Sequence, residues 1–173
     1  KNIIYFFSYL TILVGFYFNE DLLGGSRGDY QYHLKFIDLF SSDIVLGLKK
    51  YGYEGYFARN SPFFYIILSK LNEILSLNQI RLINTLSSVL IAVIFYKTLK
   101  IRFYNINKVN LKILSCILFL SPTVRSLSIW PYPILWALIF FLLSIYFFIK
   151  FKNSSYNEHK FFHISLIGLI LSS

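Results

Sequence analysis

An aspartate and a histidine four positions apart are the residues of this sequence best suited to acid–base chemistry. Asp29 and His33 follow the glycine-rich run 24–28 and precede apolar residues at helical spacing. We therefore expect Asp29 near a helix N-terminus, with His33 one turn later on the same face. The apolar stripe comprises Ile37, Phe40, Ile44 and Leu48.

Two roles are open to Asp29. An aspartate at a helix N-terminus often caps the helix, which is worth about 1 kcal/mol. A carboxylate at the mouth of a membrane enzyme can instead act as a general base that takes a proton from an acceptor hydroxyl, and desolvation at the lipid boundary strengthens such a base. His33 would then orient the carboxylate or contact a substrate phosphate, or it is simply a packed interfacial side chain. Glu20 and Asp21 are alternative acids closer to the first apolar run.

Four arginines are candidates for contact with phosphate. A planar guanidinium donates two parallel hydrogen bonds to a phosphate, and a leaving phosphate needs cations beside it. The alternative is contact with lipid headgroups while the side-chain stem stays in the apolar layer. Arg125 is the most informative, because it interrupts an apolar stretch where an unpaired charge is expensive. The candidates are Arg27, Arg59, Arg81 and Arg125.

The elements that must position these side chains are membrane helices. The chain has 173 residues, 56% of them hydrophobic and only 14% charged, whereas soluble domains carry roughly 25% charged residues. The sequence therefore predicts an all-α, multi-pass transmembrane helical bundle. Because methionine is absent and the last apolar run is unfinished at Ser173, we expect a piece of a longer protein, truncated at both ends. Spans of suitable length are predicted at about 3–18, 82–100, 109–124, 129–149 and 161–173.

The net charge of +9 is distributed unevenly. Residues 20–81 hold seven basic and seven acidic residues, whereas residues 82–173 hold nine basic residues and one acid. Basic clusters between apolar runs are typical of cytoplasmic loops. A nucleic-acid groove would intersperse aromatic residues with arginines on a soluble face, so we expect no nucleic-acid partner. One cysteine and three scattered histidines predict neither a disulfide nor a metal cluster.

Residues 62–77 are the ambiguous segment. They form an amphipathic pattern that either crosses the membrane or lies in its interface. If they do not cross, Lys1 and the loops 97–112 and 150–160 share one side, as the positive-inside rule requires. We prefer this topology, in which residues 19–81 form a large outer loop with juxtamembrane amphipathic helices. The predicted polar face is Ser69, Asn72, Glu73 and Ser76; the predicted apolar face is Phe64, Ile67, Leu68, Leu71, Ile74 and Leu75.

The order of these features resembles the N-terminal third of GT-C-fold integral membrane glycosyltransferases. Residues 29–33, Asp-Tyr-Gln-Tyr-His, are similar to the acidic motif of the mannosyl-, glucosyl- and aminoarabinosyltransferase branches, but Tyr30 replaces the usual Glu. Residues 59–65, Arg-Asn-Ser-Pro-Phe-Phe-Tyr, resemble a proline-bearing aromatic stretch, and residues 78–82, Asn-Gln-Ile-Arg-Leu, resemble the Arg-Leu start of a span. Many members also carry a second outer Asp before a proline, where this chain has Tyr132-Pro133.

The resemblance implies transfer of a sugar from a polyprenyl-phosphate-linked donor to a lipid, glycan or protein acceptor. The reaction would take place at the outer face of a bacterial inner or plasma membrane, with Asp29 as general base. A divalent metal is an option that the sequence does not require. The alternatives are a multi-span transporter or flippase subunit, or a polysaccharide polymerase or ligase of similar architecture. A transporter would place functional charges near the bilayer midplane. The implied substrate-binding residues are Arg27, His33, Arg59, Arg81 and Arg125.

Overall fold

A computed structural model describes residues 3–21, 26–53, 61–154 and 158–172, and these ranges are helical with no strand. The predicted all-α class is therefore confirmed for this part of the chain. In order, the elements are α1 (Ile3–Tyr17), α2 (Ser26–Ser42), α3 (Ile44–Lys50), α4 (Pro62–Asn72), α5 (Leu77–Ser87), α6 (Val89–Arg102), α7 (Lys108–Cys116), the 3₁₀ helix η1 (Ile117–Leu120), α8 (Pro122–Ile129), α9 (Pro133–Asn153) and α10 (His159–Ser172).

Two stretches of helix are long and apolar enough to cross a membrane. They are Leu77–Arg102, which comprises α5 and α6, and Pro133–Asn153, which is α9. The α7–η1 stretch and α8 would make a third if they form one span bent by 69°. Within the described residues, α1 and α10 are apolar but shorter. The part of the chain that the structure describes thus has two or three candidate membrane-spanning helices, and the count of five spans stays a prediction.

Capping residues and prolines explain where these helices begin. The side chains of Ser76 and Gln79 each bond the backbone N–H of the other, and this capping box starts α5 at Leu77, five positions before the predicted span. Pro122 and Pro133 occupy the first turns of α8 and α9, where a missing N–H costs no helical hydrogen bond. Pro122 therefore marks the bend in the predicted 109–124 span.

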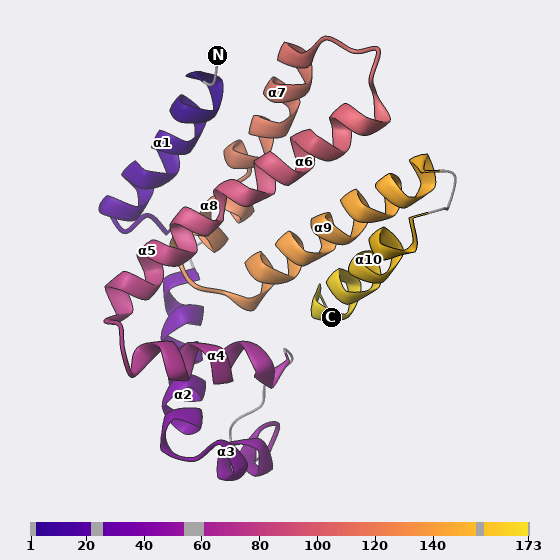
Figure 1. The fold of residues 1–173 in the computed structure, drawn as a ribbon. Coiled ribbons are helices and arrows are strands. Elements are labelled where there is room, and N and C mark those ends of the chain that lie inside the picture. The colour runs from indigo at the N-terminus through magenta and orange to yellow at the C-terminus, as the bar shows by residue number, and fades with distance from the viewer. Residues whose placement is uncertain (1–2, 22–25, 54–60, 155–157, 173) are drawn as a thin grey trace.

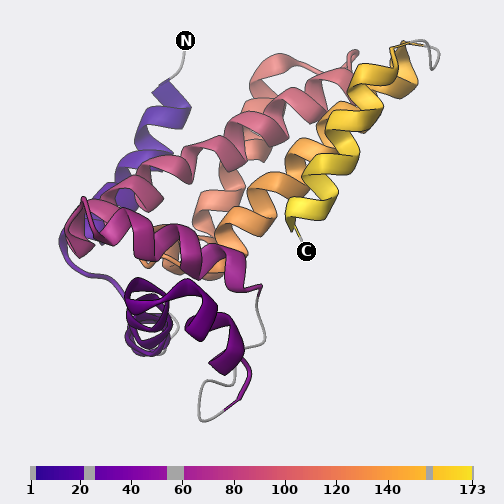
Figure 2. The ribbon, with the colours of Figure 1, turned by 60° about the horizontal axis from the view of Figure 1, so that its bottom comes forward.

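The helices form a bundle with a smaller helical layer across one end (Figure 1). Helices α1 and α5 to α10 make the bundle, and α2, α3 and α4 make the end layer. The start of α1, the α6–α7 connection and the C-terminal end of α9 lie towards the opposite end in both views (Figures 1 and 2). These three ends therefore lie towards one end of the bundle, and the preferred topology across a membrane stays a prediction.

Two apolar cores hold the layers together, and α2 contributes to both. Tyr30 of α2 joins the bundle core, whereas Phe36 and Phe40 pack against Tyr65 of α4 and Ile80 of α5. The bundle core consists of Ile12, Tyr30, Ile91, Ala92, Ile94, Phe119, Val124, Ile129, Trp130, Leu135, Ile139 and Leu142.

The faces predicted for residues 62–77 hold in part, because Leu68 is buried and Phe64, Leu71 and Leu75 pack against its core. Ser69 of the predicted polar face is fully buried, and Ile67 of the predicted apolar face is 43% exposed. The assignment is wrong at these positions because the Ser69 hydroxyl donates to the Ile66 carbonyl at 2.8 Å and so needs no water. Helix α4 has 11 residues and lies across the end of the bundle; its placement at a membrane surface stays a prediction.

Candidate functional site

Trp130 is the meeting point of the end layer and the bundle. It lies in the extended segment between α8 and α9, and it is 5% exposed. The centre of its ring lies 5.7 Å from that of Tyr30, 3.9 Å from Cζ of Arg81 and 6.0 Å from Cζ of Arg27. Its Nε1 donates a hydrogen bond of 2.9 Å to the carbonyl of Glu20. One side chain thereby positions α2, α5 and the residues after α1.

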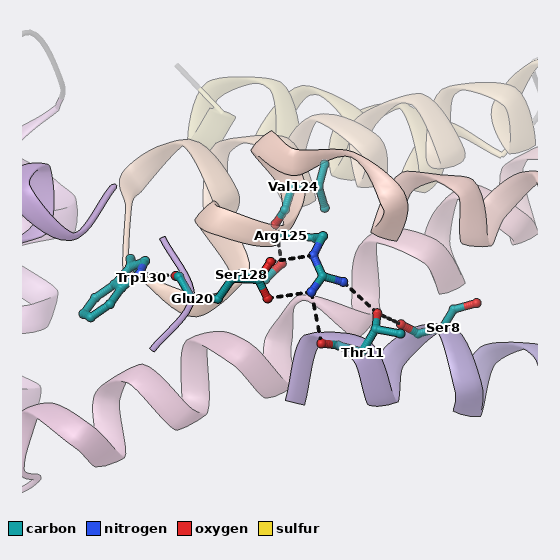
Figure 3. A network of polar contacts seen from close by, with 7 residues as sticks. All are labelled: Ser8, Thr11, Glu20, Val124, Arg125, Ser128 and Trp130. Atoms are coloured by element: carbon teal, nitrogen blue, oxygen red, sulfur yellow. Dashed lines mark hydrogen bonds and ion pairs between the residues drawn. The ribbon is translucent and has the colours of Figure 1, made fainter. Parts of the chain in front are cut away.

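The Glu20 side chain pairs with Arg125 of α8 (Figure 3). Nε of Arg125 donates to one carboxylate oxygen at 3.1 Å and Nη2 to the other at 2.6 Å. Nη1 donates to the hydroxyl of Thr11 at 2.8 Å, and Nη2 also reaches the Thr11 carbonyl at 3.2 Å. Every guanidinium nitrogen therefore has a partner, which favours a structural role for Arg125 and Glu20.

The backbone reverses direction before Glu20 and brings its carboxylate within reach of Arg125. Asn19 adopts φ of 53°, a left-handed conformation that asparagine tolerates better than most residues. The Glu20 N–H then donates to the Gly15 carbonyl at 2.8 Å, which folds the carboxylate back over α1. A Cβ on Gly15 would overlap that carboxylate, so the glycine makes room for it.

Arg81 contrasts with Arg125, because it is buried with few partners. It is 7% exposed, and its Nη1 donates only a long 3.4 Å bond to Oδ1 of Asn78. Its Nε and Nη2 find no hydrogen-bond partner among the described residues, and neither does the buried hydroxyl of Tyr30. The Thr85 hydroxyl lies 2.9 Å from the carbonyl oxygens of both Arg81 and Ser128 and shares its one proton between them, which ties α5 to α8.

Asp29 and His33 lie on the same helix but in different surroundings. Helix α2 begins at Ser26, so Asp29 belongs to its first turn and is exposed, rather than sitting at the N-cap. The desolvation expected for a general base is therefore not supplied in this structure. His33 is buried, bonds the Tyr65 hydroxyl through Nδ1 at 2.6 Å, and meets the Tyr132 ring edge-on at 4.5 Å between centres.

The electrostatics link Asp29, His33 and Tyr132. Burial lowers the pKa of His33 to about 4, and the Asp29 charge opposes this shift. The imidazole is therefore neutral near pH 7 and cannot offer a positive charge to phosphate. Burial, together with the Asp29 charge, raises the pKa of Tyr132. The Tyr132 hydroxyl thus stays protonated beside the carboxylate.

The other predicted site residues are dispersed. Arg59 lies outside the described residues, and Asp21 is exposed after α1. Arg27 is exposed above Trp130. Among the described residues, no group of three or more His, Cys, Asp or Glu side chains could hold a metal ion.

The sequence pattern does not predict the aromatic framework of the site. It assigns no role to Trp130, Tyr65 or the side chain of Tyr30, and it does not predict the contact between Thr11 and Arg125. One signal was present: Pro131 and Pro133 flank Tyr132, and residues before proline favour extended backbone. Such a segment cannot continue a helix and so presents its aromatic side chains at the bundle end.

A small apolar crevice opens beside the site. Asn84 follows Arg81 on α5 by three positions, and its Nδ2 donates to the carbonyls of Leu127 and Ser128. Its Oδ1 is buried without a partner among the described residues. The crevice is lined by Leu68, Leu71, Ile80, Ile83, Asn84, Pro131 and Trp136.

The site therefore combines two groups that share α2 and the segment 130–132. One is cationic, with Arg27 and Arg81 at the Trp130 ring, and the other contains the Asp29 carboxylate near His33 and Tyr132. Such an arrangement can bind an anion close to a carboxylate that accepts a proton. Compared with known proteins, the chain matches no family model, no curated protein and no solved structure.

Proposed function

We propose that the chain is part of an integral membrane glycosyltransferase. It would transfer a sugar from a polyprenyl-phosphate-linked donor to a hydroxyl of a lipid, glycan or protein acceptor. The observation that supports this proposal is that Arg27 and Asp29 of α2 and Arg81 of α5 all lie near the segment 130–132, at one end of an apolar helical bundle. Sugar transfer from a lipid phosphate needs both kinds of group at the membrane boundary.

The roles follow from the charges. Arg27 and Arg81 would stabilise the negative charge that develops on the departing lipid phosphate. Asp29 would accept the proton of the attacking hydroxyl, and its exposure leaves it accessible to an acceptor. A bound donor would cover the carboxylate and provide the desolvation that the free structure lacks. His33, neutral and bonded to Tyr65, would position the aromatic wall beside Asp29.

A second function is favoured by one observation. The break between η1 and α8 bends a membrane-length apolar stretch by 69°, and discontinuous helices are typical of transporters. A transporter or flippase subunit would move a lipid-linked sugar without breaking a bond. A polysaccharide polymerase or ligase would use the same carboxylate and arginines on a larger acceptor.

Sugar transfer in membranes that contain the protein tests the first proposal. We would incubate such membranes with polyprenyl-phosphate sugars and measure release of polyprenyl phosphate, which reports transfer to any acceptor. We expect Asp29→Asn to lower the rate by about 10²-fold or more, the usual contribution of a general base. The matched control is Asp38→Asn, an exposed acid on the same helix, which should retain the wild-type rate.

The outcomes separate the candidate functions. Undiminished release by Asp29→Asn would eliminate Asp29 as the base. Movement of intact lipid-linked sugar across the bilayer, with no release of polyprenyl phosphate by the wild type, would support the transporter instead.

A further inference from the structure

We propose that Arg81, Tyr30 and Arg27 form a binding site for the phosphate group of a lipid phosphate ester. The proposal deepens the proposed function and rests on it only for the place of the site in a reaction, because phosphate binding can be measured without sugar transfer.

The first observation is a buried cation that lacks a counter-charge. Arg81 is 7% exposed, and two of its guanidinium nitrogens have no partner in the described part of the chain. The rings of Trp130 and Phe16 lie 3.9 and 5.1 Å from its Cζ and offset only part of the cost of burying the charge. Nε and Nη2 are the donors that an oxyanion would use.

The second observation is a buried hydroxyl without a partner beside the same ring. Tyr30 is 4% exposed, its ring contacts Trp130 at 5.7 Å, and it interacts electrostatically with Arg81. Burial raises the pKa of Tyr30, so its hydroxyl keeps its proton and can donate. The Arg81 guanidinium has only donors, and the Tyr30 hydroxyl can donate as well as accept. This combination suits phosphate oxygens, and the Arg81 charge does not suit a cation.

The third observation is the charge around these donors. Arg27 lies near enough to Arg81 for the two charges to repel each other, and both lie over Trp130. The nearby Glu20 cannot neutralise them, because both of its carboxylate oxygens are bonded to Arg125. Two neighbouring cations therefore favour an anion that carries more than one negative charge, such as the phosphate monoester of a lipid.

The fourth observation favours a lipid as the source of the phosphate. Arg81 belongs to the apolar stretch Leu77–Arg102, which is long enough to cross a membrane, and it lies near the N-terminal end of that stretch. Leu82, Leu86 and Leu90 of the same stretch are 39, 50 and 42% exposed. A lipid packed against these side chains can therefore bring its phosphate group to the end of the span where Arg81 lies.

The two tryptophans of the chain offer a direct measurement, because Trp130 contacts Arg81. Trp136→Phe would leave Trp130 as the single reporter. The protein in phosphatidylcholine nanodiscs would be titrated with polyprenyl phosphate, with phosphatidylglycerol and, in solution, with inorganic phosphate. We expect polyprenyl phosphate to change Trp130 emission saturably, and Arg81→Gln to weaken its apparent affinity at least tenfold. Arg102→Gln, an exposed arginine at the end of α6, is the matched control and should bind as the parent does.

Tyr30→Phe keeps the proposal testable if Arg81→Gln fails to fold. Removing a buried, unpartnered hydroxyl should raise the melting temperature of the lipid-free protein. The same change should weaken polyprenyl-phosphate binding about threefold or more. A purely structural Tyr30 would not combine a gain in stability with a loss of affinity.

The remaining outcomes each decide one point. A response to inorganic phosphate alone would overturn the lipid as the source, and a response to phosphatidylglycerol equal to that of polyprenyl phosphate would overturn a preference for the monoester. No response to any of the three, or unchanged binding by Arg81→Gln and Tyr30→Phe, would overturn the site. Binding of polyprenyl phosphate without sugar transfer would support the site and remove the proposed function. Sugar transfer by the wild type, with unchanged polyprenyl-phosphate binding in Arg81→Gln and Tyr30→Phe, would support the proposed function and remove the site.

Discussion

Glu20 and Arg125, 105 positions apart, form a doubly hydrogen-bonded ion pair that joins the residues after α1 to α8. The carbonyl of the same Glu20 accepts the Nε1 hydrogen bond of Trp130. Trp130 in turn supports the guanidinium of Arg81. The ion pair therefore positions the aromatic ring on which the candidate phosphate site is built.

Glu20→Gln should destabilise the protein by about 2 kcal/mol. The amide nearly preserves the shape of the side chain but leaves the Arg125 charge, 17% exposed, without its counter-ion. Chemical unfolding in detergent, followed by tryptophan fluorescence, measures the change. The control is Glu73→Gln, which breaks a pair with Lys70 whose side chains are 48 and 51% exposed and should cost less than about 1 kcal/mol. Equal losses in the two variants would contradict a special role for Glu20.

Gly15→Ala should disrupt the same ion pair from the side of α1. The new Cβ would overlap the Glu20 carboxylate and lie 2.9 Å from Cδ1 of Ile129. We expect a loss of about 1–3 kcal/mol in the free energy of unfolding, typical of overpacking. In Gly28→Ala the added Cβ meets nothing within 4 Å, so that variant should gain up to about 1 kcal/mol from helix propensity. The same unfolding assay compares the two, and a stabilising Gly15→Ala would refute the packing argument.

Gly168→Ala should loosen the contact between α9 and α10. A Cβ there would lie 3.0 Å from the Phe140 carbonyl oxygen and 3.2 Å from the Ser144 nitrogen, and the backbone cannot give way as a side chain can. Ser165 bonds Ser144 across this contact at 2.9 Å. We expect faster amide hydrogen exchange in α10 and a loss of about 1–2 kcal/mol. Ser172→Ala, at the end of α10, is the control and should leave exchange unchanged elsewhere in the helix.

The helical elements could be predicted because their signals are local. Apolar runs, the Ser76–Gln79 capping box and prolines at first turns all act within a few residues of the helix they define. The predicted span 82–100 is shorter than α5 and α6 together because the charged Arg81 precedes the uncharged run that begins at Leu82. The Arg81 side chain turns inward, towards Trp130, and so does not end the helix.

The candidate site was predictable in its residue types but not in its pairings. The arginines were identified from charge, yet only the fold shows that Arg125 is satisfied by Glu20 and Thr11 whereas Arg81 is not. Both are arginines near apolar residues, so composition cannot tell them apart. Which one finds a carboxylate depends on the chain reversal after α1, which Asn19 permits.

Stability should fall with acid through the titration of His33. In the unfolded chain His33 has an ordinary pKa near 6.5, and burial lowers it to about 4 in the fold. Between these values the unfolded chain binds the proton and the folded chain does not. The stability that neutral His33 contributes is therefore fully present above about pH 6.5 and is lost as the pH falls towards 4, by up to about 1.4 kcal/mol per unit. The charged group that acts on His33 is Asp29, which opposes the shift.

The measurement is a difference between variants, because carboxylates also titrate in this range. Unfolding of the wild type and of His33→Gln would be compared at intervals from pH 7.5 to 4.5. Glutamine can still accept the Tyr65 hydroxyl bond but does not titrate, so its stability should fall less steeply below pH 6.5. His163→Gln, at an exposed position of α10, should follow the wild-type slope. Identical slopes for all three would mean that His33 is protonated as readily in the fold as in water, which its burial against Tyr65 and Tyr132 argues against.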